Sequence, residues 1–302
     1  MKQGVLYGIV AYLAWGMLPF YWKLFQSMGS LEILAHRIVW SLIFVLFIIV
    51  ITKRWKPLWA AAPGAKLKGA LFLCSMLISA NWLLYIWAVT NDHVMEASLG
   101  YYMNPLISVL LGVLFLKEKL GIGQWVALGM AALGVIFITV EYGHVPWVAL
   151  SLALTFAFYG LAKKLVNLEA MFGLAWETVF VTPLSLIYLI IIEMNGTGTA
   201  FALEWWKFVL LLLAGVGTAM PLYWFAQATK RLPLSTLGFI QYLSPTIQLL
   251  SAVFLFGEAF TTTHLISFSL IWGALLVFTI SSMRKKTVSV QMKPDQAIKE
   301  QA

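Results

Sequence analysis

The sequence predicts an all-α polytopic membrane protein, with ten transmembrane helices arranged as two inverted five-helix repeats and both termini in the cytoplasm. Three observations predict this fold class. The chain of 302 residues is 62% hydrophobic and only 11% charged, which is about half the charge of an ordinary soluble domain. Its apolar residues gather in runs about as long as a bilayer is thick. One motif in these runs recurs 140 residues further along the chain.

The apolar runs have the length of membrane-spanning helices, because about 20 helical residues cross a hydrocarbon core about 30 Å thick. They are continuous rather than alternating, which favours helices over the strands of a membrane barrel. The first run contains Pro19 and Lys23 and lacks a convincing cleavage site, so we interpret it as a helix and not as a signal peptide. The ten expected helices span residues 4–24, 31–52, 67–90, 94–116, 120–141, 145–165, 170–193, 205–229, 233–256 and 261–283.

The segments between the runs are short, so the helices are expected to pack as one bundle. The longest connection, residues 53–68, contains Pro57 and Pro63 and is expected to lie at the surface. The expected organisation is a first repeat at residues 1–141, a second repeat at 142–283 and a basic, disordered cytoplasmic tail at 284–302.

The positive charges favour one orientation in the membrane. With the N-terminus inside, 17 of the 20 lysine and arginine residues fall in inner segments, as the positive-inside rule expects. The exceptions are Lys23, Arg37 and Lys207. An even number of crossings then puts both termini on the cytoplasmic side of the cell membrane. This topology explains the net charge of +8, so no nucleic-acid partner is expected.

The recurring motif combines a tyrosine, a proline and a glutamate at unchanged spacing. Five expected helices separate each element from its copy, so the second copy crosses the membrane in the opposite direction. Such an inverted repeat is typical of transporters that work by alternating access. The first copy contains Tyr102, Pro105 and Glu118, and the second contains Tyr242, Pro245 and Glu258.

Ionisable side chains within a bilayer are costly and are often functional. Glu32, His36 and Arg37 lie near the outer end of the second expected helix. Glu32 and His36 are four residues apart and can meet on one helix face. Arg37 can extend outward to the interface or bind a facing carboxylate. A structural role and a role in the substrate path both remain open for these three residues.

Four further carboxylates lie in or beside the expected helices. Glu177 follows Arg37 by 140 residues, but the inversion puts the two at different depths, so no direct salt bridge is expected. Glu177 either supports the fold or couples protons. Glu96 begins the fourth helix, either as a cap or as a charge in an outer vestibule. Glu118 and Glu258 each precede another helix and are expected to stabilise its start.

Pro105 and Pro245 each remove one helical hydrogen bond and are expected to kink their helices. In a membrane the freed carbonyl needs a polar partner or a water-filled cavity, so we expect both helices to face a central pathway. Kinks that serve packing alone are the alternative. Aromatic walls with a few amides suit small organic molecules. The expected pathway residues are Trp15, Asn81, Tyr85, Tyr101, Tyr102, Asn104, Tyr223, Gln241, Tyr242 and Gln248.

Several strings of residues resemble a known family. Residues 14–16 (Ala-Trp-Gly) and 256–258 (Phe-Gly-Glu) are similar to motifs of EamA-type permeases in the drug/metabolite transporter superfamily. The first copy of the motif has lysine in the glycine position. Residues 15–23, 79–82 and 100–106 resemble the RarD branch of that family. The resemblance covers nearly the whole chain, and it implies ten helices in two antiparallel sets of five.

The resemblance also implies a secondary transporter of small organic solutes, metabolites or drug-like molecules, in the cytoplasmic membrane. Export is the expected direction. Protons are a candidate coupling partner, with uncoupled facilitation as the alternative. The sequence specifies neither the solute nor the oligomeric state.

Catalysis is not expected from this sequence. Its four histidines have no metal-ligand spacing, and no phosphate-binding glycine loop is present, so no metal or other cofactor is expected. The lone Cys74 excludes an intramolecular disulfide. A polytopic membrane enzyme acting on lipid or isoprenoid substrates is the alternative class. It would need convergent acidic residues, whereas the two aspartates are Asp92, in an expected outer loop, and Asp295, in the tail.

Overall fold

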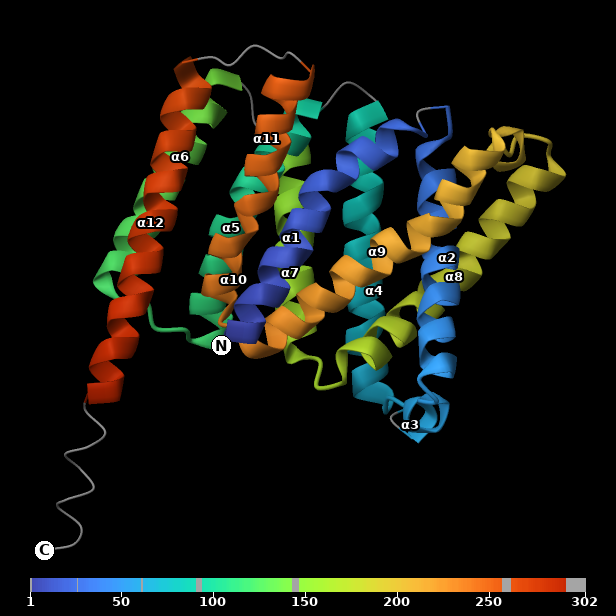
Figure 1. Cartoon of the computed structure of the whole chain (residues 1–302), viewed down its shortest axis with the longest axis horizontal. Helices are drawn as coiled ribbons and strands as arrows, with labels where there is room; N and C mark the ends of the chain where they lie inside the picture. The colour runs from blue at the N-terminus through green and yellow to red at the C-terminus, as the bar shows by residue number, and fades with distance from the viewer. Residues whose placement is uncertain are drawn as a thin grey trace, which may run out of the picture.

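The computed structural model describes residues 2–25, 27–60, 62–90, 94–142, 147–256 and 262–291, and all regular structure in these ranges is helical. Figure 1 shows the long helices lying side by side in one bundle, with α9 crossing in front of α4 and α2. The helices are α1 (Lys2–Lys23), α2 (Ser30–Ile51), α3 (Trp55–Ala60), α4 (Ala65–Thr90), α5 (Val94–Leu116), α6 (Ile122–Tyr142), α7 (Trp147–Leu165), α8 (Ala170–Met194), η1 (Ala200–Ala202), α9 (Trp205–Arg231), α10 (Leu234–Gln241), α11 (Leu243–Phe256) and α12 (Thr262–Gln291).

Seven of these helices are long and apolar enough to cross a membrane: α1, α2, α4, α5, α7, α8 and α9. Two more, α6 and α12, contain shorter apolar stretches, Ile122–Phe137 and Leu265–Ser281. The expected all-helical class is therefore confirmed for the described part of the chain, and every expected run except 233–256 overlaps a single observed helix.

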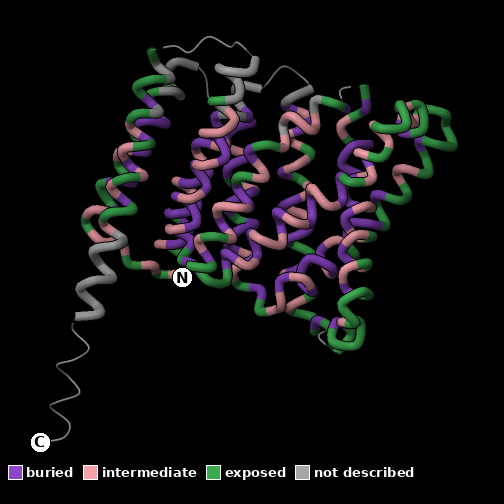
Figure 2. The backbone as a smooth tube through the Cα atoms, viewed as in Figure 1, coloured by how far each residue is buried: buried purple, intermediate pink, exposed green. Residues whose placement is uncertain are grey.

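The outer surface of the bundle carries large apolar side chains. Leu114, Ile122, Val140, Leu184 and Leu276 are between 61% and 85% exposed, and Figure 2 shows buried residues concentrated on the central helices. Exposed apolar surface of this extent is costly in water, whereas hydrocarbon accommodates it. The surface therefore suits a lipid environment.

The run expected at residues 233–256 is wrong as a single helix, because the chain interrupts it at Tyr242 to form α10 and α11. Pro245 lies in the first turn of α11, where a missing N–H costs no helical hydrogen bond. Pro105 lies inside α5, which is assigned as one continuous helix. The two copies of the proline motif therefore differ in backbone structure.

Two segments are more helical than the sequence predicted. The connection at residues 53–68 contains α3 (Trp55–Ala60). The last helix continues to Gln291 instead of ending at residue 283, so the start of the expected disordered tail is helical. Residues 284–291 contain no glycine or proline that would end the helix. Residues 292–302 lie outside the described part of the chain.

The helices pack closely where glycine faces a neighbouring backbone. Gly215 of α9 lies against the Trp40 carbonyl of α2, and a Cβ atom at this position would collide with it. Gly238 of α10 faces the Pro105 carbonyl of α5, which a Cβ atom would approach to 2.9 Å. Small residues at such crossings let membrane helices come together. These contacts bring α5 and α10, and α2 and α9, around a common interior.

Candidate functional site

A cavity opens between α1, α2, α4, α5, α7, α10 and α11. Its empty space, part of which is open to the surroundings, is about 610 Å³. Aromatic rings, three amides and a single arginine form most of the wall. The lining residues are Tyr12, Trp15, Leu18, Trp22, Arg37, Asn81, Trp82, Tyr85, Tyr101, Phe156, Gln241, Ser244, Pro245 and Gln248.

Six of the ten pathway residues expected from the sequence line this cavity, together with Arg37 and the kink residue Pro245. Their elements place them there: α1 contributes one, α4 two, α5 one, α10 one and α11 one. The six are Trp15, Asn81, Tyr85, Tyr101, Gln241 and Gln248.

The other four expected pathway residues, and Pro105, are not among the lining residues. The hydroxyl of Tyr102 donates to the Pro245 carbonyl at 3.1 Å, so it joins α5 to α11. Asn104 is buried, and its Oδ1 accepts a hydrogen bond from the Ser108 hydroxyl at 3.1 Å. Each of these side chains satisfies a polar group inside the bundle.

Tyr223 and Tyr242 serve packing in the described structure. Tyr223 packs against the largest apolar cluster, and Tyr242 is buried in a second cluster with Phe239 and Phe278. The sequence reasoning did not separate residues that face the cavity from their neighbours one position away on the same helix. Successive residues of a helix are rotated by about 100°, so neighbouring residues face different directions. Which of them faces the cavity depends on tertiary packing.

Six lining residues were not among the ten expected pathway residues, and their spacing along the helices could have indicated most of them. Tyr12, Leu18 and Trp22 share a face of α1 with Trp15, at spacings of three and four residues. Trp82 follows Asn81 on α4. Ser244 lies three residues after Gln241 and four before Gln248, so the same spacing could have indicated it. Phe156 carries no comparable signal.

An aromatic cluster closes one end of the cavity. Phe225 stacks on Tyr159 with ring centroids 5.7 Å apart, and it meets Tyr12 and Trp15 at 6.3 and 5.6 Å. Phe156 lies 5.5 Å from Trp15. Tyr12 also donates a long hydrogen bond of 3.4 Å to Gln241 Oε1. These contacts join α1, α7, α9 and α10 at the end of the cavity where Tyr12 and Phe156 lie.

Arg37 neither reaches the surface nor binds a carboxylate in the described part of the chain. It is 2% exposed, and its guanidinium carbon lies 4.3 Å from the ring centroids of both Trp22 and Trp82. Its Nε donates to the Thr218 hydroxyl at 3.3 Å. The arginine is therefore held between two tryptophan rings at the cavity wall.

Glu32 and His36 do not form the pair that their spacing allows. The Glu32 carboxylate accepts hydrogen bonds from the backbone N–H of Thr199 at 2.8 Å and of Ala200 at 3.0 Å, and from the Thr199 hydroxyl at 2.8 Å. It therefore holds the segment before α9. His36 Nε2 is buried without a hydrogen-bond partner among the described residues. Neither side chain lines the cavity.

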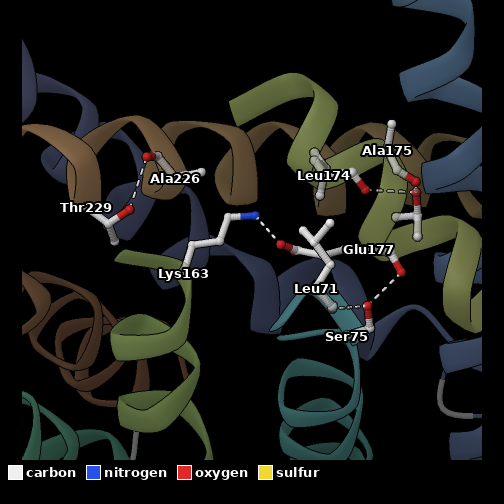
Figure 3. Close-up of polar contacts among 9 residues, drawn as sticks. Leu71, Ser75, Lys163, Leu174, Ala175, Glu177, Ala226 and Thr229 are labelled. Atoms are coloured by element: carbon white, nitrogen blue, oxygen red, sulfur yellow. Dashed lines mark hydrogen bonds and ion pairs between the residues drawn. The ribbon is translucent and has the colours of Figure 1, made fainter. Parts of the chain in front are cut away.

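Glu177 pairs with Lys163, not with Arg37, as the depth argument expected. Lys163 Nζ lies 2.6 Å from Glu177 Oε1, and both side chains are 3% exposed (Figure 3). Lys163 lies in the last turn of α7, within the helix expected at residues 145–165. Burial beside a carboxylate explains its position, because a lysine inside a membrane protein needs a partner.

Glu118 stabilises a helix start, although not that of the helix that follows it. Its carboxylate accepts from the backbone N–H of Leu234 at 2.6 Å and of Ser235 at 3.0 Å, at the N-terminus of α10. The start of α6 is held instead by Gln124, which accepts from Gly121 N–H. The Glu96 side chain and Glu258 lie outside the described residues.

The fold and cavity define a class: a polytopic helical bundle with an apolar exterior and a small-molecule cavity between its helices. A model of the EamA-like transporter family matches residues 2–140 and again residues 145–280. The chain therefore belongs to the EamA family and is an integral, multi-pass membrane protein of a transporter family.

Curated relatives match over nearly the whole chain. The uncharacterized transporter YojE of Bacillus subtilis is 47% identical over 292 residues, covering 95% of this chain and 97% of the relative. Protein RarD of Escherichia coli K12 is 40% identical over 282 residues, covering 93% and 95%. These matches identify the chain as a RarD-type permease of the family, in agreement with the resemblance seen in the sequence.

A solved crystal structure shares the fold. It superposes with a TM-score of 0.71 at 17% identity, and the match covers 92% of this chain and 98% of the other.

Among the described residues, no group of three or more His, Cys, Asp or Glu side chains could hold a metal ion.

Proposed function

We propose that the protein is a secondary transporter that exports small organic solutes across the cytoplasmic membrane by alternating access. The observation that carries this proposal is the cavity, because its wall combines residues from the first half of the chain, such as Trp15 and Tyr85, with Gln241 and Gln248 from the second. A solute held between two halves is released to either side when the halves rock against each other.

The proposed architecture is ten transmembrane helices in two inverted repeats, with α10 and α11 together forming the ninth crossing. The family model matches twice, once in each half. Helix contacts also repeat: α1 packs on α9 as α7 packs on α4, and α5 packs on α7 as α11 packs on α1. Each pair is related to its counterpart by five crossings, which supports the repeat.

The proposed topology has both termini in the cytoplasm. The distribution of lysine and arginine supports it. In Figure 1 the start of α1 and the C-terminal part of α12 lie at the same end of the bundle, as an even number of crossings requires.

The described conformation fits one step of alternating access. Leu18 and Trp22 lie in the second half of α1, and Arg37 lies in the first half of α2. The cavity therefore lies toward the end of the bundle that the proposed topology assigns to the outside. The cluster of Tyr12, Phe156, Tyr159 and Phe225 lies on its inner side and would have to open for a solute to enter from the cytoplasm.

Thiol labelling tests this mechanism, because Cys74 is the single cysteine and is buried. In a Cys74→Ser background, Gln248→Cys reports on the cavity and Leu237→Cys reports on the smaller space behind Tyr12 and Phe156. In oriented proteoliposomes, conditions that increase labelling of Leu237→Cys from the inside should protect Gln248→Cys from outside reagent. Leu276→Cys, on the exposed face of α12, is the control. Independent labelling of the two sites under every pH and voltage gradient would contradict alternating access.

A further inference from the structure

The cavity wall contains a buried cation with no anion beside it among the described residues. Of the described residues that line the cavity, Arg37 is the single charged one. Within the described part of the chain its one hydrogen bond joins Nε to Thr218. The two terminal nitrogens of the guanidinium therefore have no protein acceptor there.

The two intramembrane carboxylates considered as partners of Arg37 have other partners. Glu32 accepts three hydrogen bonds from Thr199 and Ala200, and Glu177 is paired with Lys163. An unpaired charge inside a membrane protein is costly and points to a ligand path. In the described structure, Arg37 is compensated by the Thr218 hydroxyl and the faces of two tryptophan rings alone.

The stacking of Arg37 prepares it to bind an oxyanion. Trp22 and Trp82 each lie 4.3 Å from the guanidinium carbon, so the two rings restrict the orientation of the group. A guanidinium presents parallel N–H donors that match the two oxygens of a carboxylate. Arginine held in this way binds a carboxylate at lower entropic cost than a mobile side chain would.

The rest of the wall suits a flat apolar body. Trp15, Tyr85, Tyr101 and Phe156 contribute aromatic surface, and Asn81 and Gln248 contribute amides. No carboxylate is among the described residues that line the cavity, so a positively charged amine would meet no counter-ion there and would be repelled by Arg37. An anion with one negative charge would neutralise the site.

We propose that this cavity selects organic monoanions, and specifically aromatic carboxylates, by pairing the carboxylate with Arg37 while the ring lies against the aromatic wall. This inference rests on the proposed function, since it names the substrate class of the same cavity. Of the two roles that the sequence left open for Arg37, structural support and a role in the substrate path, it assigns the second.

Matched ligands test the proposal on the full-length purified protein. The probes are 3-phenylpropionate, 3-phenylpropanamide and 3-phenylpropylamine, which share one apolar body and differ in charge. Binding is followed by quenching of tryptophan fluorescence and by thermal shift. The carboxylate should bind at least about ten-fold more tightly than the amide, as expected for a charge-assisted bidentate pair, and the amine should bind most weakly.

The variants separate recognition from folding. In Arg37→Gln the preference for the carboxylate should disappear while affinity for the amide stays within about two-fold, because the aromatic wall is intact. Arg37→Lys should retain part of the preference, since lysine keeps the charge but not the paired donors. The control is Arg54→Gln, which removes an arginine that pairs with Glu169 outside the cavity. It should behave as the unaltered protein.

Several results would overturn the proposal. They are equal binding of the amide and the carboxylate, no binding of the carboxylate at all, or an unchanged preference in Arg37→Gln. The comparison of the three ligands on the wild-type protein needs no variant. It therefore tests the proposal even if Arg37→Gln folds poorly. Transport of neutral or cationic solutes in proteoliposomes would overturn the anion class and leave the transporter standing. Tight carboxylate binding with no flux under any gradient would overturn the proposed transport and leave the anion class standing.

Discussion

Lys163 and Glu177 form a buried ion pair, with 2.6 Å between Nζ and Oε1. The lysine ends α7 and the glutamate lies in the second turn of α8, so the pair ties these two helices together across their short connection (Figure 3). Glu177 also accepts at its backbone carbonyl from the Ser75 hydroxyl of α4, at 2.9 Å. One residue therefore contacts two neighbouring helices by separate groups.

Removing one partner of this pair should destabilise the protein strongly. Glu177→Gln or Lys163→Met leaves an uncompensated polar group in the interior, which costs about 3–5 kcal/mol in such pairs. Thermal unfolding of the detergent-solubilised protein measures the loss. The double variant Lys163→Met with Glu177→Leu should recover most of it, because no buried charge is left alone. If the loss of stability in the double variant equalled the sum of the losses in the two single variants, this account would be contradicted. A shifted pH profile of transport in Glu177→Gln would assign proton coupling to the pair.

The cap that Glu118 provides on α10 should be measurable as stability. Glu118→Ala removes the acceptor for the Leu234 and Ser235 N–H groups and should cost about 0.5–2 kcal/mol. Glu118→Gln should cost less, since one carbonyl acceptor remains. Glu169→Gln is the matched control, because Glu169 pairs with Arg54 at the surface, where an ion pair contributes little. An equal loss in the control would argue against the cap.

Gly215 should tolerate no side chain. A Cβ atom in Gly215→Ala would meet the Trp40 carbonyl of α2, so α2 and α9 must separate, at a cost typical of overpacking, about 1–3 kcal/mol. Gly217→Ala lies one half-turn away on α9, where the nearest atom to a new Cβ is 3.8 Å distant, and it should be nearly neutral. Thermal unfolding compares the two. A neutral Gly215→Ala would mean that the crossing is looser than described.

The hydrogen bond from Tyr102 to the Pro245 carbonyl should contribute about 1 kcal/mol. Tyr102→Phe removes only the hydroxyl and should lower the unfolding temperature by a few degrees. Tyr223→Phe makes the same change at a tyrosine that packs in the apolar core, and it should have a smaller effect. The opposite order would show that this bond does not hold α5 against α11.

Much of the fold could be predicted from the sequence because membrane helices depend on local composition and length. Runs of apolar residues gave nearly every helix to within a few residues. The break at Tyr242 could not be predicted, because Pro105 and Pro245 have the same local spacing and yet the chain is broken near one and continuous at the other.

The site was predicted less completely. Trp15, Gln241 and Gln248 were recognised because aromatic and amide residues are conspicuous in a membrane helix. Tyr102 and Asn104 have the same chemistry but face hydrogen-bond partners inside the bundle. The partners of Glu32 and Glu118 lie 167 and 116 residues away, a separation that local sequence reasoning cannot bridge.

The unequal copies of the proline motif have an energetic consequence. In a carrier built from two identical inverted halves, a two-fold rotation about an axis in the membrane plane would interchange the outward-facing and inward-facing forms, which would then have equal energy. Here a continuous α5 faces a jointed pair, α10 and α11. Under the proposed alternating access, the two end states should therefore differ in free energy, and the protein should prefer one side at rest before any solute or gradient acts on it.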